Sequence, residues 1–201
     1  MIRLENLREC TLPLVVLIVG MPGSGKSVVS DAAQKVGYSV VRMGDIVREI
    51  ASMLNRQATD ESLGEVALRI RAEHGMDIVA RLTLHKACTE YRNTPIVIEG
   101  VRSLEELEFF RSHALKCYLV AVHASPKTRF SRLSTRNRSD DPRSWEDFTR
   151  RDLRELKMGL GSVMALADVM LINENKTIEQ FMEEAEKILS EILSISNYAQ
   201  A

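Results

Sequence analysis

A phosphate-binding loop near the amino terminus constrains this chain more than any other feature. The loop reads Gly20-Met21-Pro22-Gly23-Ser24-Gly25-Lys26-Ser27, and it directly follows the apolar run of residues 14–19. An apolar stripe at helical spacing comes next, formed by Val29, Ala32, Ala33 and Val36. A strand, a glycine-rich turn and a helix in this order are the context in which such a loop binds phosphate. An ordinary glycine-rich turn with an exposed lysine does not account for that context.

Each part of this P-loop has a predicted chemical task. The glycines let successive backbone N–H groups turn inward around phosphate oxygens, and the start of the helix adds the positive end of its dipole. Lys26 is expected to reach the β- and γ-phosphates, and the Ser27 hydroxyl is placed to ligate Mg²⁺. Residues 20–27 are therefore predicted to bind ATP together with magnesium.

Short apolar runs alternate with amphipathic stretches along the rest of the chain. Strands are expected at residues 14–19, 38–43, 96–99, 117–123 and 169–172. This alternation is typical of an α/β fold in which helices cover both faces of a parallel sheet, a three-layer sandwich. The chain has 201 residues, which fits one domain over residues 1–201.

Several helix boundaries can be predicted from local residue pairs. A serine or threonine with an acid or amide three residues later predicts a helix start, and three pairs have this spacing: Ser103 with Glu106, Ser144 with Asp147, and Thr177 with Gln180. Ser125 followed by Pro126 predicts a fourth start. Gly37 predicts the end of the helix that follows the P-loop.

Two long stretches interrupt the alternation. Residues 44–94 are expected to form an insertion of two or three helices with a break near Gly75. Residues 125–167 are expected to form a helix, a polar loop and further helix. Insertions at strand ends are where an acceptor site and a mobile lid are found. We therefore name residues 44–94 the acceptor-side insertion and residues 125–167 the lid region.

The charge of the chain is nearly balanced, but one segment is basic. The formal net charge is −1, so no overall field attracts nucleic acid or anionic lipid. Residues 127–157 contain ten lysines and arginines against six acidic residues. A single basic segment in a chain that is otherwise acidic is better able to bind a compact anionic ligand than a long polyanion. A small-molecule phosphate acceptor is therefore the expected partner, and nucleic acid is a less favoured one.

The cysteines and the amino terminus predict a cytoplasmic protein. Cys10, Cys88 and Cys117 are odd in number and far apart, which argues against disulfides and a zinc site. Glu5 and Glu9 interrupt the positive segment that a signal peptide needs. No apolar run approaches the roughly 20 residues of a membrane span, so no membrane contact is expected.

Two charged residues follow the third predicted strand. Glu99 ends that strand, at the place where a Walker B carboxylate holds the metal or its waters, and it is the candidate magnesium ligand beside Ser27. Arg102 comes after the Gly100 turn and is expected to project from the sheet edge where ligands bind. The alternative for Glu99 is an acid that pairs with a lysine, and the alternative for Arg102 is an ordinary surface arginine.

Asp45 and Arg48 stand where the second strand gives way to a helix. Asp45 is well placed as the helix N-cap, and it is the nearest candidate base if the acceptor is a hydroxyl. Arg48 is expected in the first turn, where a cation opposes the helix dipole and is better explained by an external anion. Asp45 and Arg48 are both predicted to contact the acceptor. The alternatives are that Asp45 only caps the helix and that Arg48 is an ordinary surface arginine.

Arginines dominate the lid region. Arg129, Arg132 and Arg136 share one helix face, and no acid lies between residues 125 and 136 to pair with them. Unpaired arginines on one face are candidates for gripping a polyphosphate or its transition state, with a solvated basic face as the alternative. Arg138 lies in the polar loop with Asp140 and Asp141, and it could belong to this group or to the ordinary pairs. We predict Lys26 of the P-loop, Arg132, Arg136 and Arg138 as the catalytic residues.

Arg150 and Arg151 each follow an acid by four residues, Glu146 and Asp147, and are interpreted as pairs within one helix. No cluster of histidine and cysteine, serine elbow or paired nucleophile and base stands out in the sequence. A phosphate acceptor is already anionic, so it needs positioning and charge neutralisation rather than a strong base.

The chain resembles the nucleoside monophosphate kinase branch of P-loop proteins, and most closely an archaeal family described as adenylate-kinase-related or dephospho-CoA-kinase-like. The likeness spans residues 14–193. Besides the P-loop, it is carried by Met43-Gly44-Asp45-Ile46-Val47-Arg48-Glu49, Glu99-Gly100-Val101-Arg102-Ser103, Arg136-Asn137-Arg138-Ser139-Asp140-Asp141, and Arg150-Arg151-Asp152 followed by Ala167-Asp168.

The resemblance implies a five-stranded parallel sheet in the order 2-3-1-4-5, with the P-loop after the central strand. It also implies that Arg48 and Arg102 hold the acceptor phosphate, and that Asn173 lies near the adenine. Glu99 departs from the family pattern, which usually has aspartate at this position.

Three functions follow as hypotheses. The first is a kinase that transfers the γ-phosphoryl group of ATP·Mg²⁺ to a nucleoside monophosphate or a related phosphorylated metabolite. The second is an ATPase switch with an RNA or protein partner, which the basic lid region and the additional helices favour. The third is a dephospho-CoA-type kinase that acts on a hydroxyl. The first accounts for the most residues.

Overall fold

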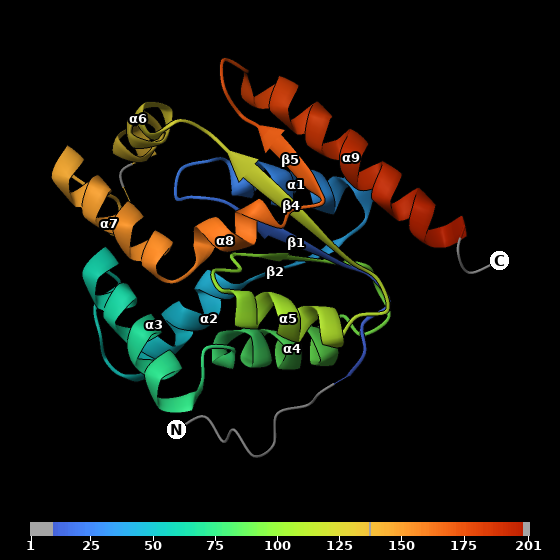
Figure 1. The fold of residues 1–201 in the computed structure, drawn as a ribbon, viewed down its shortest axis with the longest axis horizontal. Helices are drawn as coiled ribbons and strands as arrows, with labels where there is room; N and C mark the ends of the chain where they lie inside the picture. Colours follow the sequence, from blue (N-terminus) through green and yellow to red (C-terminus); the bar gives the residue numbers. More distant parts are fainter. Residues whose placement is uncertain (1–9, 137, 199–201) are drawn as a thin grey trace.

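The computed structural model describes residues 10–136 and 138–198. Five parallel strands form one sheet in the order β2-β3-β1-β4-β5 (Figure 1). The strands are β1 (Val15–Val19), β2 (Ser39–Arg42), β3 (Ile96–Glu99), β4 (Cys117–His123) and β5 (Val169–Ile172). The predicted strand order is confirmed, and each predicted strand matches an observed one to within one residue at either end.

Helices cover both faces of the sheet. On one face lie α1 (Lys26–Val36) and α9 (Ile178–Tyr198), and on the other lie α4 (Ile78–Glu90), α5 (Leu104–Ser112) and α8 (Leu160–Ala165). The central strand β1 is buried along its whole length. Successive side chains of a strand point to opposite faces, so Leu17 belongs to one hydrophobic core and Ile18 to the other. The predicted three-layer α/β fold is confirmed.

The two interruptions of the sequence pattern are helical. Between β2 and β3 the chain forms α2 (Met43–Met53), α3 (Asp60–His74) and α4, and α3 ends at Gly75. Between β4 and β5 it forms α6 (Pro126–Arg136), α7 (Trp145–Lys157) and α8. Figure 1 places α7 beside α3, so the lid region and the acceptor-side insertion meet at one end of the molecule.

Most predicted caps have the expected hydrogen bonds. The Ser144 hydroxyl accepts from the Asp147 N–H at 3.0 Å and begins α7. Thr177 and Gln180 exchange both bonds of a capping box, at 2.9 and 3.2 Å. Gly37 ends α1 with a φ of 105°, a left-handed conformation that glycine adopts without strain.

The prediction that the cysteines form no disulfide is wrong. Cys10, before β1, is bonded to Cys88 of α4, and their Cα atoms are 6.0 Å apart. The two cysteines are 78 positions apart in the sequence, and no spacing rule detects such a pair, because only the packing of α4 against the sheet brings them together. Cys117 is a free, partly buried thiol, and burial raises its pKa to about 11.

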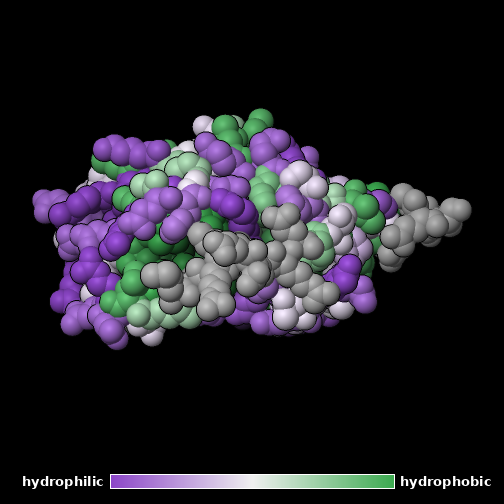
Figure 2. All heavy atoms as spheres, turned by 90° about the horizontal axis from the view of Figure 1, so that it is seen from below, coloured by the Kyte–Doolittle hydropathy of each residue, from purple (hydrophilic) through white to green (hydrophobic). Residues whose placement is uncertain are grey.

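The face of the molecule in Figure 2 is mostly polar. Hydrophilic residues cover most of what is described there, and hydrophobic residues show through in smaller areas at the left, at the top and toward the right. Among residues 10–136 and 138–198, no helix combines the length and the apolar composition that a membrane span requires.

Candidate active site

The P-loop connects β1 to α1 through a backbone path that favours glycine. Gly23 and Gly25 have φ values of 81° and 107°, which side chains rarely adopt. A Cβ on Gly23 would lie 2.8 Å from the backbone oxygen of Arg129, so the loop packs closely against α6. A glycine loop that leads into a helix N-terminus has the backbone arrangement that binds phosphate.

Lys26 spans the P-loop at the first position of α1. Its Nζ donates to the carbonyl oxygen of Gly20 at 2.7 Å and to that of Met21 at 3.2 Å. Desolvation lowers the pKa of this lysine to about 8, while the negative charges of Glu99 and Glu155 act to raise it. The side chain is therefore held by neutral acceptors, in reach of charges from β3 and α7. The Ser27 side chain is exposed.

Asn173 and Arg132 brace the P-loop from outside. The buried Asn173 donates from Nδ2 to the carbonyl oxygen of Ser24 at 2.9 Å. Arg132 donates to the same oxygen at 3.3 Å, and to the backbone and side-chain oxygens of Asn173 at 3.0 and 3.1 Å. The loop is thus held by α6 and by the residue that follows β5. Nucleotide contact by Asn173 and a catalytic role of Arg132 stay predictions.

Arg129 has a partner that the sequence did not indicate. It is buried and pairs with Asp152 of α7 through two hydrogen bonds, of 2.8 and 2.5 Å. Its Nη1 also donates to the carbonyl oxygen of Pro22 at 3.2 Å. The expectation of an unpaired face on α6 is therefore wrong for Arg129, because α7 folds back over α6 and supplies the acid.

Glu99 lies at the carboxyl end of β3, beside Ile18 of β1 and Arg42 of β2 in the strand register. Its Oε2 accepts from the Ser30 hydroxyl at 2.7 Å and from Arg42 Nε at 3.3 Å. Its charge acts on Lys26, which places the carboxylate beside the P-loop. A hydroxyl and a carboxylate at this edge are oxygen ligands of the kind that Mg²⁺ prefers, so Ser27 and Glu99 fit the predicted metal site.

An open pocket lies next to this edge, between α2, α3, α7 and the segment after β3. Its volume is about 490 Å³, including space open to solvent. Four arginines contribute to its wall: Arg48, Arg102, Arg151 and Arg154. Three acids alternate with them: Asp60, Asp140 and Glu155. Arg102, Arg151 and Glu155 all act on the pKa of Lys26, and Arg102 follows β3, which pairs with the strand that leads into the P-loop, so the pocket and the P-loop lie at the same edge of the sheet.

Arg48 and Asp45 differ in detail from the sequence prediction. The helix α2 begins directly after β2, with Arg42 in the N-cap position. Asp45 is therefore not the N-cap, and Arg48 lies in the second turn rather than the first. Arg48 donates to Asp45 and to Asp140, each at 3.2 Å. Arg48 does line the pocket, and acceptor binding by both residues stays a prediction.

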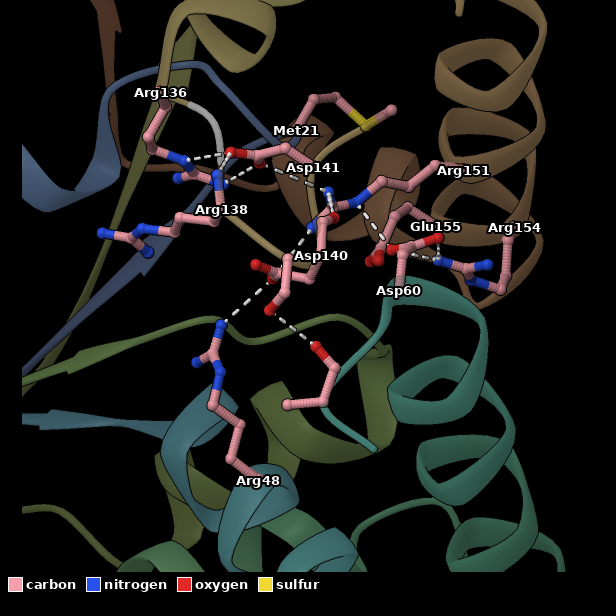
Figure 3. A network of polar contacts seen from close by, with 12 residues as sticks. Met21, Arg48, Asp60, Arg136, Arg138, Asp140, Asp141, Arg151, Arg154 and Glu155 are labelled. Atoms are coloured by element: carbon pink, nitrogen blue, oxygen red, sulfur yellow. Dashed lines mark hydrogen bonds and ion pairs between the residues drawn. The ribbon is translucent and has the colours of Figure 1, made fainter. Parts of the chain in front are cut away.

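The other predicted arginines are near the same space: Arg102 lines the pocket, and Arg136 and Arg138 lie close to Asp140 and Asp141 in Figure 3. Arg102 pairs with Glu155 at 3.1 Å. Arg136 forms an ion pair with Asp141, which keeps the pKa of that carboxyl below its usual value against the effect of burial. In Figure 3 the Arg138 guanidinium extends away from the dashed network. The guanidinium forms no hydrogen bond or ion pair with another described residue, although the backbone N–H of Arg138 donates to Asp141 at 2.9 Å.

Arg150 and Arg151 were expected to form pairs within α7, and this is wrong for Arg151. Arg150 does pair within α7, but with Asp147, three residues earlier, at 2.6 Å, and not with Glu146. Arg151 instead points across the pocket, where it forms an ion pair with Asp60 of α3 at 3.1 Å and donates to the Asp140 carbonyl oxygen at 2.8 Å. The acid four residues earlier is a neighbour on the helix surface, but Asp60 comes close only because α3 packs beside α7.

Comparison with known proteins identifies the family. A family model described as "AAA domain" matches residues 16–154. The UPF0200 protein of Hyperthermus butylicus is 47% identical over 179 residues, which cover 89% of this chain and 95% of that protein. The chain belongs to the UPF0200 family.

Solved structures confirm the fold of this UPF0200 chain as that of P-loop kinases. Shikimate kinase from Bacteroides thetaiotaomicron matches with a TM-score of 0.58 at 16% identity, over 90% of this chain and 98% of that one. A gluconokinase from Sinorhizobium meliloti matches with a TM-score of 0.54 at 17% identity, over 95% and 99% of the two chains. At such identities the likeness concerns the fold alone.

Sequence reasoning predicted two charged pocket residues of the UPF0200 chain, Arg48 and Arg102, and missed the other five: Asp60, Asp140, Arg151, Arg154 and Glu155. Arg154 donates to both oxygens of Asp60, at 2.8 and 2.7 Å. Asp60 is the first residue of α3, and its sequence context indicates only an acid in the first turn of a helix. The sequence context of Arg154 and Glu155 indicates only ordinary residues of a charged helix. Only the packing of α3 against α7 brings them together.

Proposed function

We propose that this UPF0200 protein is a phosphotransferase that uses ATP·Mg²⁺ and a small anionic acceptor, of the class of nucleoside monophosphates and related phosphorylated metabolites. One observation carries the proposal. Arg102 of the four-arginine pocket follows β3, the strand paired with β1, and β1 leads into the P-loop; the charges of Arg102 and Arg151 also act on the pKa of Lys26. A P-loop and an arginine pocket at the same edge of the sheet are the two halves of a site for phosphoryl transfer between anions.

The composition of the pocket favours an anionic acceptor over an alcohol. An alcohol needs a carboxylate that is available to take its proton, whereas a phosphate oxygen is already ionised. The acids of the pocket wall are all engaged in ion pairs: Asp60 with Arg151 and Arg154, Asp140 with Arg48, and Glu155 with Arg102. A bound phosphate can take over arginine contacts that these acids now make.

The residues around the P-loop have complementary tasks in this proposal. Bound Mg²⁺ would neutralise charge on the β- and γ-phosphates, with Ser27 and Glu99 as the residues that hold it or its waters. Lys26 would bind the same phosphates, and Arg136 and Arg138 would approach from the lid region. Arg48 and Arg102 would hold the acceptor phosphate, in keeping with the resemblance to nucleoside monophosphate kinases.

An acceptor panel tests the proposal. ATP·Mg²⁺ is incubated with the protein and one of several nucleoside monophosphates, dephospho-CoA, shikimate or gluconate, and ADP formation is measured. We expect at least one monophosphate to raise ADP formation about 100-fold or more over hydrolysis in water. Turnover with the alcohols shikimate or gluconate alone would contradict an anionic acceptor. Hydrolysis that no acceptor accelerates would contradict phosphoryl transfer to a small molecule.

A further inference from the structure

The carboxylate of Glu99 is held by one oxygen only. Both donors that reach it, the Ser30 hydroxyl at 2.7 Å and Arg42 Nε at 3.3 Å, bond to Oε2. Within residues 10–136 and 138–198, Oε1 has no hydrogen-bond partner. The side chain is 16% exposed, so it has little room to rotate. The two donors thus fix the orientation of the carboxylate and leave one oxygen available.

Ser30 and Arg42 reach Glu99 from two different elements. Ser30 is fully buried on α1, one turn after Lys26 and Ser27. Arg42 is the last residue of β2 and the direct neighbour of Glu99 in the strand register. Arg42 is itself oriented by Asp31 of α1, at 3.4 Å. The helix that follows the P-loop therefore controls Glu99 both directly, through Ser30, and indirectly, through Asp31 and Arg42.

A glutamate at this position needs such control more than an aspartate does. Glutamate has one more rotatable bond, and fixing a flexible side chain costs conformational entropy. A carboxylate that is already oriented in the free protein does not pay this cost when a ligand binds. Partners that orient a metal-binding side chain typically change metal affinity by 10–100-fold when they are removed.

We propose that Ser30 and Arg42 are positioning residues that hold Oε1 of Glu99 toward the magnesium ion of a bound nucleotide. The inference rests on the proposed function, because it requires that the P-loop bind a nucleotide with its metal. The inference goes beyond the proposed function because it assigns Ser30 and Arg42, two residues outside the P-loop motif, to the metal site. It also explains how a glutamate, rather than an aspartate, can act as the metal ligand at position 99.

The test measures metal binding rather than turnover. Mn²⁺ replaces Mg²⁺ as the probe, and its affinity for the complex of protein and ADP is measured by electron paramagnetic resonance. ADP affinity without metal is measured separately in EDTA. We expect Ser30→Ala to weaken Mn²⁺ binding about 10-fold, while metal-free ADP affinity and the melting temperature stay close to those of the wild type.

Two further variants serve as controls. The first tests whether the direction of the Arg42 hydrogen bond matters or only its charge, and the second tests whether the loss of any serine hydroxyl has the same effect. Arg42→Lys keeps the positive charge but removes the directed Nε–H bond, and Arg42 is partly exposed, so this variant is expected to fold and to weaken Mn²⁺ binding as well. Ser190→Ala is the matched control, because the Ser190 hydroxyl donates to a backbone carbonyl of α9 at 2.7 Å. It should leave Mn²⁺ affinity unchanged.

The possible failures can be told apart. If the wild type binds ADP and Mn²⁺ but Ser30→Ala and Arg42→Lys bind Mn²⁺ equally well, the positioning role is wrong and the proposed function stands. If Ser30→Ala loses metal-free ADP affinity to the same extent as Mn²⁺ affinity, Ser30 supports the P-loop as a whole and the inference is overturned. If the wild type binds no nucleotide with or without metal, the proposed function itself fails.

Discussion

Asp140 accepts a hydrogen bond from Arg48 across 3.2 Å, and this contact joins the lid region to the acceptor-side insertion over the pocket. Asp140 precedes α7, and Arg48 comes from the second turn of α2. An arginine that is 41% exposed on its side chain and held by two acids is a good binding group for an anion, because the anion exchanges one charged partner for another instead of meeting a bare cation.

Arg48→Ala should raise the KM for the anionic acceptor about 10–100-fold, since a hydrogen bond to a charged group contributes roughly 1.5–3 kcal/mol. The Kd of ATP·Mg²⁺ should stay within about twofold of the wild-type value. Arg56→Ala is a suitable control, because Arg56 forms an exposed pair with Glu65 outside the pocket lining. Equal losses for both ligands would give Arg48 a structural role instead.

Arg138→Ala should lower kcat about 10–100-fold without changing the melting temperature. The guanidinium has no partner in the described part of the chain, so its removal breaks no ion pair, whereas it can act on charge that develops during transfer. Steady-state kinetics together with thermal melts would check this. Arg143→Ala, in the same loop, should leave kcat unchanged, and similar kcat losses in both variants would indicate a nonspecific effect of loop charge.

ATP affinity should fall as the pH rises above 8. The pKa of Lys26 is lowered to about 8, so its positive charge is present below this pH and is lost above it. A bound phosphate favours the charged form, and binding at pH 9 should therefore take up a proton. Calorimetry in buffers of different ionisation enthalpy should show this uptake, with affinity about 10-fold lower at pH 9 than at pH 7. A flat profile would contradict the lowered pKa.

Loss of the Cys10–Cys88 disulfide should destabilise the fold by about 2–4 kcal/mol, because the bond closes a long loop that would otherwise gain entropy on unfolding. Cys88→Ser in denaturant melts should show this loss, and reduction of the wild-type protein should reproduce it. Cys117→Ser is the control for a buried thiol outside the disulfide. Reductant-insensitive stability of the wild type would contradict a structural disulfide.

The parts of the fold that depend on local pattern were predictable from the sequence. The strands have short apolar runs, the P-loop has its glycines, and the capping residues of α5, α7 and α9 have fixed spacing. The predicted N-cap Asp45 was wrong because β2 passes into α2 without a loop, which moves the helix start to Met43. Propensity alone does not fix that boundary.

The pocket depends on tertiary contacts and was only partly predictable. Arg48 and Arg102 were predicted to bind a ligand from their positions after the second and third strands, the family resemblance implied that they hold the acceptor phosphate, and both line the pocket. Arg151 and Asp60 are 91 positions apart in the sequence, and their pairing follows from the packing of α3 beside α7. The Cys10–Cys88 disulfide was missed for the same reason.

The central claim is that the P-loop grips the triphosphate of a magnesium-bound nucleotide, and calorimetric titration with ATP·Mg²⁺ tests it most directly. The wild-type protein should bind ATP·Mg²⁺, and Lys26→Ala should weaken binding about 100-fold. Lys35→Ala, which removes an exposed lysine of the same helix, should bind as the wild type does. A folded wild-type protein without measurable affinity for ATP·Mg²⁺ would contradict the account.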